Sequence, residues 1–451
     1  MNIPVKISLW EKEVAVIVWD SKKEYAVIEF LESIVRDKLD LAPLTMPYAD
    51  LVRGERIFSF PTLSSKTFKG LPGLIADSLP DDYGNSVIDA WFASHGMSVS
   101  ITPLDRLCYI GKRGMGALEY EPTIADNVLN ESSRLEIPAL VALADEVLNK
   151  RRVFHAELER NEKEIIDVLK VGTSAGGAKP KAIIAFNKKT KEVRSGQVKA
   201  PEGFTYWILK FDGMEGGMIK DNPTGIGRIE YAYHKMAVDC GIQMTECQLL
   251  HENDKAHFMT KRFDRSDNGD KFHTQTFCAM AHYDRDDRYS YEQLFRIMRQ
   301  LHLPYSDMEQ MYRRMVFNVI AFNHDDHTKN HSFIMNREGE WSLAPAYDLC
   351  YSYSPSGKWT NQHQLSLNGK RDNFTQDDLI TVGKKTDIRN VTDIIEHITE
   401  VVAQWTTYAK MADVNKDHSK QIEDTLQKSF VKRLWVRSEG KSYSKSCTHI
   451  F

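Results

Sequence analysis

A short polar segment late in the chain holds the side chains best suited to chemistry. It is the run NHDDHTKN, residues 323–330, which lies between a stretch typical of a helix, MVFNVIAF, and one typical of a strand, HSFIM. Phosphoryl transfer needs a carboxylate that orients or deprotonates the acceptor hydroxyl, and oxygen ligands for Mg²⁺. The segment offers carboxylate and amide oxygens together, so it is a candidate site for that reaction.

The spacing within the segment separates its two acidic residues. Protein kinases place an Asn five residues after the catalytic Asp, and Asp325 and Asn330 have that spacing whereas Asp326 does not. Eighteen residues after Asn330, past a predicted hairpin, Asp348 occupies the place of a second, metal-binding Asp. Lys329 could neutralise the charge that develops on the transferred phosphoryl group.

Two other interpretations of segment 323–330 stay open. It could be a plain polar loop, although two adjacent acids and several histidines so close together are costly to bury without partners. It could also bind a catalytic metal ion in a hydrolase, because four of its side chains are possible ligands: His324, Asp325, Asp326 and His327. The hydrolase interpretation leaves the Asn330 spacing unexplained.

A kinase-like site also needs a lysine on a strand to hold the phosphates. Lys210 ends the apolar stretch WILK, and a lysine buried in such a strand needs a counter-charge. Glu230, in the helical stretch IEYAYHKMAVDCG, is a candidate partner. The alternative is a lysine at the edge of the strand that extends to water.

The stretch VGTSAGGAKPKAIIAF, residues 171–186, is a third candidate. Its glycines at 172, 176 and 177 free the backbone to curl around phosphates. It nearly matches a P-loop, but Ala178 stands where lysine is required and a strand follows instead of a helix, which excludes a P-loop NTPase. A Gly-rich flap between strands fits a kinase lid better, with a plain hairpin turn as the alternative.

The composition of the 451 residues, 42% hydrophobic and 27% charged, is that of a globular protein of two or three domains. The net charge of −4 excludes a chain-wide basic surface for nucleic acid, though not a local patch. No stretch approaches roughly 18 apolar residues and no secretory signal is evident, so we expect a cytoplasmic protein without membrane contact. Six scattered cysteines without a CxxC pair indicate reduced thiols.

The order of the predicted elements gives an α+β outline. The stretches VKISLW, VAVIVWD and YAVIEF read as short strands of a small sheet, and the Gly-, Pro- and Asp-rich stretch 60–84 reads as loop and turn. A second group of strands is predicted from AKPKAIIAFN, FTYWILKFDG and AHFMTKRFDRS. Beyond about residue 275 the pattern is mostly helical, with one embedded hairpin and a basic tail at the end.

Taken in order, these blocks resemble the HipA family of serine/threonine kinases, the toxins of bacterial toxin–antitoxin pairs. GLPGLIADSLPDDYG and LDRLCYIGKRGMGALEYEP look like its N-terminal subdomain, and its kinase core is matched by GTSAGGAKPKA, WILKFD, TKRFDR, FNHDDHTKNHSF, LAPAYDL and LSLNGK. The resemblance implies a two-lobed, protein-kinase-like (HipA-like) fold. It would have a small β-rich N-terminal subdomain over 1–125, a kinase N-lobe with Gly-rich loop and hinge over 126–264, and a helical C-lobe over 265–451.

The resemblance also implies roles for individual residues. Asp325 would be the catalytic base, with His327 and Lys329 completing the catalytic loop, and Asn330 and Asp348 would bind Mg²⁺. ATP would be held by the Gly-rich loop, the strand lysine and the hinge, which correspond to Ser174, Gly176, Gly177, Lys210, Lys261, Phe263 and Asp264. The hinge contacts of Lys261 and Phe263 would come from their backbones, so they would survive the presence of Lys261 where the best-known relatives carry an acid.

Ser174 falls where the family carries a serine that the kinase phosphorylates in itself. That modification ejects the Gly-rich loop from the ATP site and silences the enzyme, and the about two added negative charges would repel the ATP phosphates. The adjacent Thr173 is a second hydroxyl, so the two residues stay alternatives for the modified position.

Substrates and partners follow from the resemblance as well. The family's known substrates include aminoacyl-tRNA synthetases, and its usual partner is a small helix-turn-helix antitoxin (HipB-like), through which any DNA contact would be made. Two other functions stay open. One is a small-molecule phosphotransferase on the same scaffold, which also uses an Asp and an Asn five residues apart; the other is a non-catalytic chain that only holds an antitoxin on DNA.

Overall fold

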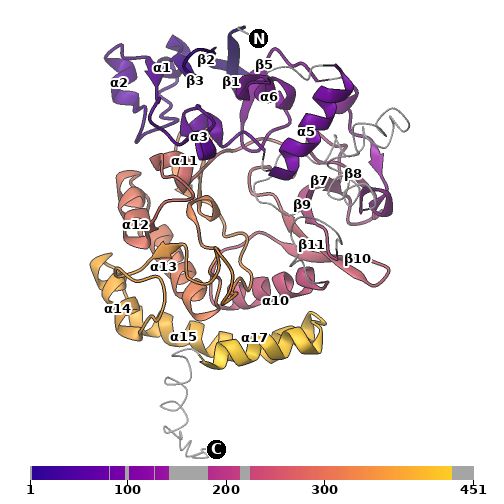
Figure 1. Ribbon diagram of the computed structural model, residues 1–451, viewed down its shortest axis with the longest axis vertical. Helices are drawn as coiled ribbons and strands as arrows, with labels where there is room; N and C mark the ends of the chain where they lie inside the picture. Colours follow the sequence, from indigo (N-terminus) through magenta and orange to yellow (C-terminus); the bar gives the residue numbers. More distant parts are fainter. Residues whose placement is uncertain are drawn as a thin grey trace, which may run out of the picture.

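The computed structural model describes residues 3–80, 82–96, 101–125, 127–141, 181–213 and 224–428. Within these ranges the chain contains both helices and mainly antiparallel sheets, which confirms the predicted α+β class. Figure 1 shows the first five strands at one end of the molecule, a second sheet in the middle and the helices α12 to α17 towards the other end. No described helix is both long enough and apolar enough to cross a membrane.

The N-terminal unit is built on an antiparallel sheet with strand order β4-β3-β2-β1-β5. Alternate side chains of β1 are buried, as the period-two pattern of VKISL predicts. The strands are β1 (Val5–Leu9), β2 (Lys12–Asp20), β3 (Tyr25–Phe30), β4 (Ile57–Ser59) and β5 (Leu118–Glu121). The helices are α1 (Glu32–Arg36), α2 (Tyr48–Val52), α3 (Ser65–Phe68), α4 (Gly73–Ala76), α5 (Asp82–Ser94) and α6 (Pro103–Ile110).

A six-stranded antiparallel sheet follows, with order β10-β11-β9-β7-β8-β6. Its strands are β6 (Arg134–Leu135), β7 (Lys181–Phe186), β8 (Val193–Ser195), β9 (Thr205–Lys210), β10 (Cys247–Glu252) and β11 (Lys255–Lys261). Helix α10 (Ile226–Asp239) packs against β11, and Gly227 permits this approach because a Cβ there would lie 2.2 Å from the Ala256 carbonyl oxygen. This sheet and helix position Lys210 and Glu230.

The C-terminal lobe is mainly helical and contains the predicted hairpin. That hairpin, β14 (Ser332–Met335) and β15 (Trp341–Leu343), is joined by β12 (His273–Thr276), while β13 (Tyr289–Ser290) and β16 (Leu365–Ser366) form a separate parallel pair. The helices are α11 (Phe277–Ala281), α12 (Tyr291–Gln300), α13 (Tyr305–Ile320), α14 (Gln376–Lys385), α15 (Val391–Ala403), α16 (Trp405–Met411) and α17 (Lys416–Lys428).

Two large hydrophobic clusters form the core. One joins the N-terminal sheet to the middle sheet, and the other fills the helical lobe around α13 and α15. The five cysteines in the described ranges are free and four of them are buried, in agreement with the prediction of reduced thiols. The candidate site lies where the middle sheet meets the helical lobe.

Candidate active site

The segment 323–330 forms a loop between α13 and β14, and this loop is closed by a hydrogen bond across it. The Asn330 side-chain amide donates to the backbone carbonyl of Asp325 at 2.6 Å, and a short 3₁₀ turn, η2 (Thr328–Asn330), brings the two residues together. The Asp325 side chain is 43% exposed, so its carboxylate is open to a substrate. The structure thus brings together the two residues that the five-residue spacing singled out.

Asp326 has the opposite environment, because its side chain has no exposed surface. Its carboxylate accepts hydrogen bonds from the Tyr291 hydroxyl at 2.7 Å, from His363 Nδ1 at 2.9 Å and from the Gln364 backbone N–H at 2.7 Å. Burial would raise the pKa of Asp326, but the His363 ring and these hydrogen bonds hold it below its ordinary value. Asp326 therefore anchors the loop to the segment around residue 363 and is not available to a substrate.

His327 and Lys329 are held by the backbone of the same loop. The Lys329 backbone N–H donates to His327 Nδ1 at 3.2 Å, so the neutral ring carries its proton on Nε2, which lies 3.7 Å from Asp325 Oδ1. Burial, aided by the nearby Arg285 charge, lowers the His327 pKa to about 3. His327 is therefore neutral near pH 7 and directs an N–H towards the exposed carboxylate of Asp325.

Lys210 at the end of β9 lies between two carboxylates. Its ammonium forms an ion pair with Glu230 of α10 at 2.5 Å and another with Asp348. Burial alone would lower the Lys210 pKa, but Asp348 and Glu230 outweigh burial and raise it above the ordinary value. The predicted pairing of Lys210 with Glu230 is confirmed, and the alternative of a lysine that extends to water is excluded.

Asp348 joins this ion pair from the segment that follows the β14–β15 hairpin, and its backbone is left-handed with φ of +53°. Burial would raise its pKa, but the Lys210 and Lys181 ammonium groups hold it below the ordinary range, so the group is ionised. Lys181 begins β7 directly opposite Lys210 in the strand register. Lys181 was not among the predicted site residues, although its place beside an apolar strand is the same kind of signal as that of Lys210.

The structure shows the surroundings of Lys261 and Phe263, the two residues at and after the end of β11 that were predicted to form the hinge. The Lys261 backbone N–H donates to the Glu246 carbonyl at 2.8 Å. A backbone contact of Lys261 with the adenine of ATP would therefore have to come from its carbonyl oxygen. The Phe263 ring stacks on Tyr347 with 5.7 Å between centroids. This stacking places an aromatic surface at the hinge. Its second ring, Tyr347, directly precedes Asp348 in the sequence.

Asp264 is fully buried and its carboxylate holds neighbouring segments together. Its carboxylate accepts from Arg262 Nε and Nη2 at 2.8 and 2.7 Å, from Arg265 Nη1 at 2.8 Å and from the Gly116 backbone N–H at 2.7 Å. Burial would raise its pKa, but the two guanidinium groups hold it well below the ordinary range. The side chain therefore joins the hinge to the N-terminal unit. Asp264 was expected near the nucleotide, and this contact was not predicted.

Tyr347 links the segment after β11 to the loop 323–330. Its hydroxyl donates to the Lys329 carbonyl at 2.7 Å and lies 2.5 Å from the Ser332 hydroxyl, while its ring contacts Phe263. Because Tyr347 directly precedes Asp348, one residue fixes the position of three parts of the site. No role for Tyr347 was predicted from the stretch LAPAYDL.

The Gly-rich stretch cannot be placed against these residues. Thr173, Ser174, Gly176, Gly177 and Ala178 all lie outside the described residues, so the choice between a phosphate-binding flap and a hairpin turn stays a prediction.

The contacts favour the phosphotransferase interpretation of the loop over the metal-hydrolase one. His324 stacks on Phe322 and faces the Thr360 carbonyl at 3.1 Å, and Asp326 is fully engaged elsewhere. In the described ranges, no three His, Cys, Asp or Glu side chains converge as they would around a metal ion. Asp348, with a side chain 33% exposed, and the Asn330 amide oxygen are hard oxygen donors of the kind that Mg²⁺ prefers, so they fit the predicted ion.

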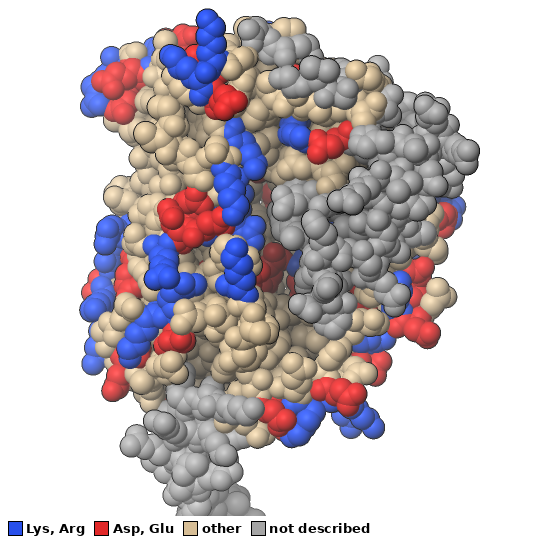
Figure 2. All heavy atoms as spheres, viewed as in Figure 1, with Lys and Arg blue, Asp and Glu red and all other residues tan. Residues whose placement is uncertain are grey.

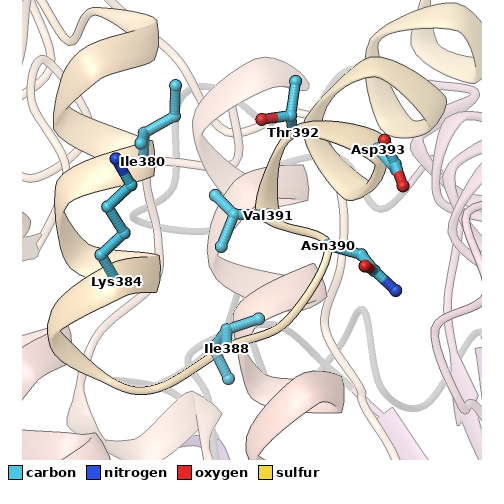
Figure 3. A pocket seen from close by; sticks show the side chains of 7 residues that line it. All are labelled: Ile380, Lys384, Ile388, Asn390, Val391, Thr392 and Asp393. Carbon is cyan, nitrogen blue, oxygen red and sulfur yellow. The ribbon is translucent and has the colours of Figure 1, made fainter.

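One face of the molecule is hollowed (Figure 2). Figure 2 shows a depression near the centre of this face, with acidic side chains recessed in it and basic ones along its rim. Two other grooves lie elsewhere. One of 460 Å³ between α14 and α15 is shown in Figure 3, and one of 680 Å³ lies beside Trp341 and His302. Neither is lined by any of the residues that surround Lys210.

Comparisons with known proteins agree with this architecture. Residues 5–121 match the family model of the HipA N-terminal domain, and residues 173–405, more than half of the chain, match that of the HipA-like C-terminal domain. The chain is 25% identical over 236 residues to the putative kinase Y4dM of Sinorhizobium fredii (strain NBRC 101917 / NGR234). That match covers 49% of this chain and 55% of the relative, so the chain spans little more than half the length of that relative.

Among solved structures, a chain of the Shewanella oneidensis MR-1 toxin–antitoxin complex of HipA, HipB and operator DNA has the same fold, with a TM-score of 0.65 and 15% identity. The superposition covers 95% of this chain and 99% of that one. The Helicobacter pylori proinflammatory kinase CtkA is more distant, with a TM-score of 0.37, 13% identity, and coverage of 52% and 91%. The two family matches and the shared fold lead to one conclusion: this chain belongs to the HipA family.

Proposed function

We propose that this protein is an ATP- and Mg²⁺-dependent serine/threonine protein kinase that acts as the toxin of a toxin–antitoxin pair. The observation that carries the proposal is the ion pair of Lys210 with both Glu230 and Asp348. A strand lysine paired with a helix carboxylate, beside an exposed Asp and an Asn five residues on, is the arrangement that phosphoryl transfer from ATP requires.

Each residue has a distinct task in this reaction. Asp325 accepts the proton of the acceptor hydroxyl or orients it, and the neutral His327 ring lies beside it, with Nε2 3.7 Å from Asp325 Oδ1. Lys210 holds the phosphates of ATP, and Lys329 counters charge on the transferred group. Asn330 and Asp348 would hold Mg²⁺, which supplies charge neutralisation to the phosphates when it is bound.

The test is transfer of radioactive γ-phosphate from ATP by the full chain to a bacterial lysate and to itself. We expect labelled protein bands that depend on Mg²⁺ and are absent with Asp325→Asn. Equal labelling by wild type and Asp325→Asn would overturn the proposal. Phosphorylation of a metabolite fraction without labelled protein would favour a small-molecule phosphotransferase instead, and binding of an antitoxin without any ATP turnover would favour a non-catalytic function.

The substrate and partner are proposed on the family relationship. A component of translation such as an aminoacyl-tRNA synthetase is the proposed substrate, and phosphoproteomics shortly after induction would identify it. A small HipB-like antitoxin is the proposed partner, because the Shewanella relative was crystallised with HipB and operator DNA. We expect the product of the neighbouring gene to co-purify with this chain and to bring it to DNA that the chain alone does not bind.

A further inference from the structure

The Gly- and Pro-rich segment 71–80 of the N-terminal unit packs on the C-terminal lobe beside the catalytic loop. Helix α4 of this segment lies against α11, and the contact is close because a Cβ on Gly73 would lie 2.3 Å from the Ala279 carbonyl oxygen. The Gly73 backbone N–H donates to His282 Nε2 at 2.9 Å, directly after the end of α11. The N-terminal unit thus contacts α11 at its C-terminal end.

Asp77 of the same segment contacts the other end of α11. Its carboxylate accepts from the Thr276 backbone N–H at 2.6 Å and from the Thr276 hydroxyl at 2.9 Å. The same hydroxyl accepts from the Ala279 N–H at 3.1 Å and so caps the first turn of the helix. A carboxylate from the N-terminal unit therefore completes the cap of a helix in the other lobe.

Helix α11 in turn supports the catalytic loop. It packs against the 3₁₀ turn η2, and the Phe277 N–H at its start donates to the His331 carbonyl at 2.7 Å, just after that turn. The backbone of Lys329 is fixed on both sides, through its N–H to His327 and its carbonyl to Tyr347. The position of Lys329 therefore depends on the turn η2, which α11 supports.

The charge of Lys329 acts on the buried Asp77 carboxylate. Burial raises the Asp77 pKa, and the main effect opposing that rise is the Lys329 ammonium, followed by the bonds from Thr276. The two hydrogen bonds from Thr276 are what keep the Asp77 carboxylate itself fixed.

We propose that Asp77 is a positioning residue of the kinase centre: from the N-terminal unit it holds the start of α11, and through α11 it holds the turn η2 that carries Lys329. The N-terminal unit is then a working part of the catalytic site. This inference rests on the proposed function, because Lys329 matters only if phosphate is transferred.

The first test compares Asp77→Asn with a matched control, Asp40→Asn, in steady-state kinase assays of the full chain. Asp40 is also a partly buried acid of the N-terminal unit near the C-terminal lobe, where its backbone carbonyl accepts from Trp341 Nε1 at 3.0 Å. We expect Asp77→Asn to lower kcat about tenfold while the KM for ATP changes less than about twofold, and Asp40→Asn to retain both. An unchanged kcat for Asp77→Asn would overturn the inference.

A double-mutant cycle with Lys329→Met separates positioning from general stability. If Asp77 acts through Lys329, Asp77→Asn causes no further loss of kcat in the Lys329→Met background. Losses that multiply in the double variant would show that Asp77 acts independently of Lys329 and would overturn the inference. Thr276→Val, which removes one of the two hydrogen bonds to Asp77, gives a second route should Asp77→Asn fold poorly; a kcat equal to wild type in Thr276→Val would likewise count against it.

Failure of this inference is distinguishable from failure of the proposed function. If wild type transfers phosphate and Asp325→Asn does not, the kinase proposal stands whatever Asp77→Asn does. If wild type itself transfers none, the kinase proposal fails and this inference fails with it.

Discussion

The Asn330 side chain donates to the backbone carbonyl of Asp325 at 2.6 Å, which turns a five-residue spacing into a closed loop. The bond uses the amide nitrogen of Asn330 and so leaves its oxygen directed to the other side of the amide group. It also fixes the peptide of Asp325 while the carboxylate stays 43% exposed. One residue is thereby held rigidly with its reactive group open, which is what a catalytic base needs.

Asp325→Asn should remove kinase activity without loss of the fold. The amide keeps the size of the side chain but cannot take a proton, and general-base catalysis contributes about 10²–10⁴-fold to such reactions. We expect kcat to fall by about 10²-fold or more while the melting temperature changes little, because the side chain is largely exposed. Radiolabel transfer and thermal unfolding measure the two effects on the same preparation.

Asp326→Asn should mainly lower the stability of the fold, whereas Asp325→Asn mainly lowers activity. The buried carboxylate accepts from Tyr291, His363 and Gln364, and an amide in its place must present N–H groups to some of these donors. We expect a loss of about 2–4 kcal/mol in the free energy of unfolding. Chemical denaturation would measure it, and a variant as stable as wild type would show that this network does not anchor the loop.

Glu230→Gln tests the ion pair that holds Lys210. Without the Glu230 charge the ammonium retains Asp348 alone, so it is drawn towards that carboxylate and away from its place beside α10. We expect kcat/KM for ATP to fall roughly tenfold or more, with the chain still folded. Glu246→Gln is a suitable control, because its partner Lys188 lies on the exposed surface. Equal losses in the two variants would contradict a specific role of Glu230.

Much of the site could be predicted because its spacing is local. The spacing of five between Asp325 and Asn330 lies within one loop, and Lys210 ends one apolar strand, so both could be recognised from short stretches of sequence. The hairpin between them and Asp348 was also predicted, since its alternation and its turn are local features. Glu230 was identified because a buried lysine must have a counter-charge, which is an energetic requirement.

The remaining contacts depend on segments that are far apart in the chain. Asp326 meets His363 across 37 residues, Asp264 meets Gly116 across 148, and Asp77 meets Thr276 across 199. No local pattern encodes such pairs, because they arise only when separate units pack together. The helices α3 and α4, each four residues long, were likewise taken for loop, since one turn shows no hydrophobic period.

Ser174→Ala should remove most self-phosphorylation. The prediction rests on the family relationship, with Thr173 as the alternative acceptor directly before it in the sequence. Mass spectrometry of protein incubated with ATP would identify the modified residue, and Thr173→Ala is the matched control. Phosphate on Thr173, with Ser174→Ala still labelled as strongly as wild type, would assign the site to Thr173.

The contact between the two units should weaken in mild acid through His282. This ring accepts the Gly73 N–H and packs against Phe60 and Phe68, and burial lowers its pKa to about 4, compared with about 6.5 in an unfolded chain. Between these values the unfolded chain binds more protons than the folded one, so the free energy of unfolding falls as the pH drops from about 6.5 towards 4. Above about pH 7 the effect vanishes because both forms are neutral.

His282→Asn should therefore flatten the dependence of stability on pH. Between pH 7 and pH 5 the free energy of unfolding of the wild type should fall by of order 2 kcal/mol more than that of the variant, because the variant lacks the histidine whose protonation is linked to unfolding. His302→Asn is the matched control: it too has a left-handed backbone after a helix, but its side chain is exposed. Denaturation curves at the two pH values measure this difference. If the free energy of unfolding changes equally with pH in wild type and His282→Asn, other groups govern the acid sensitivity.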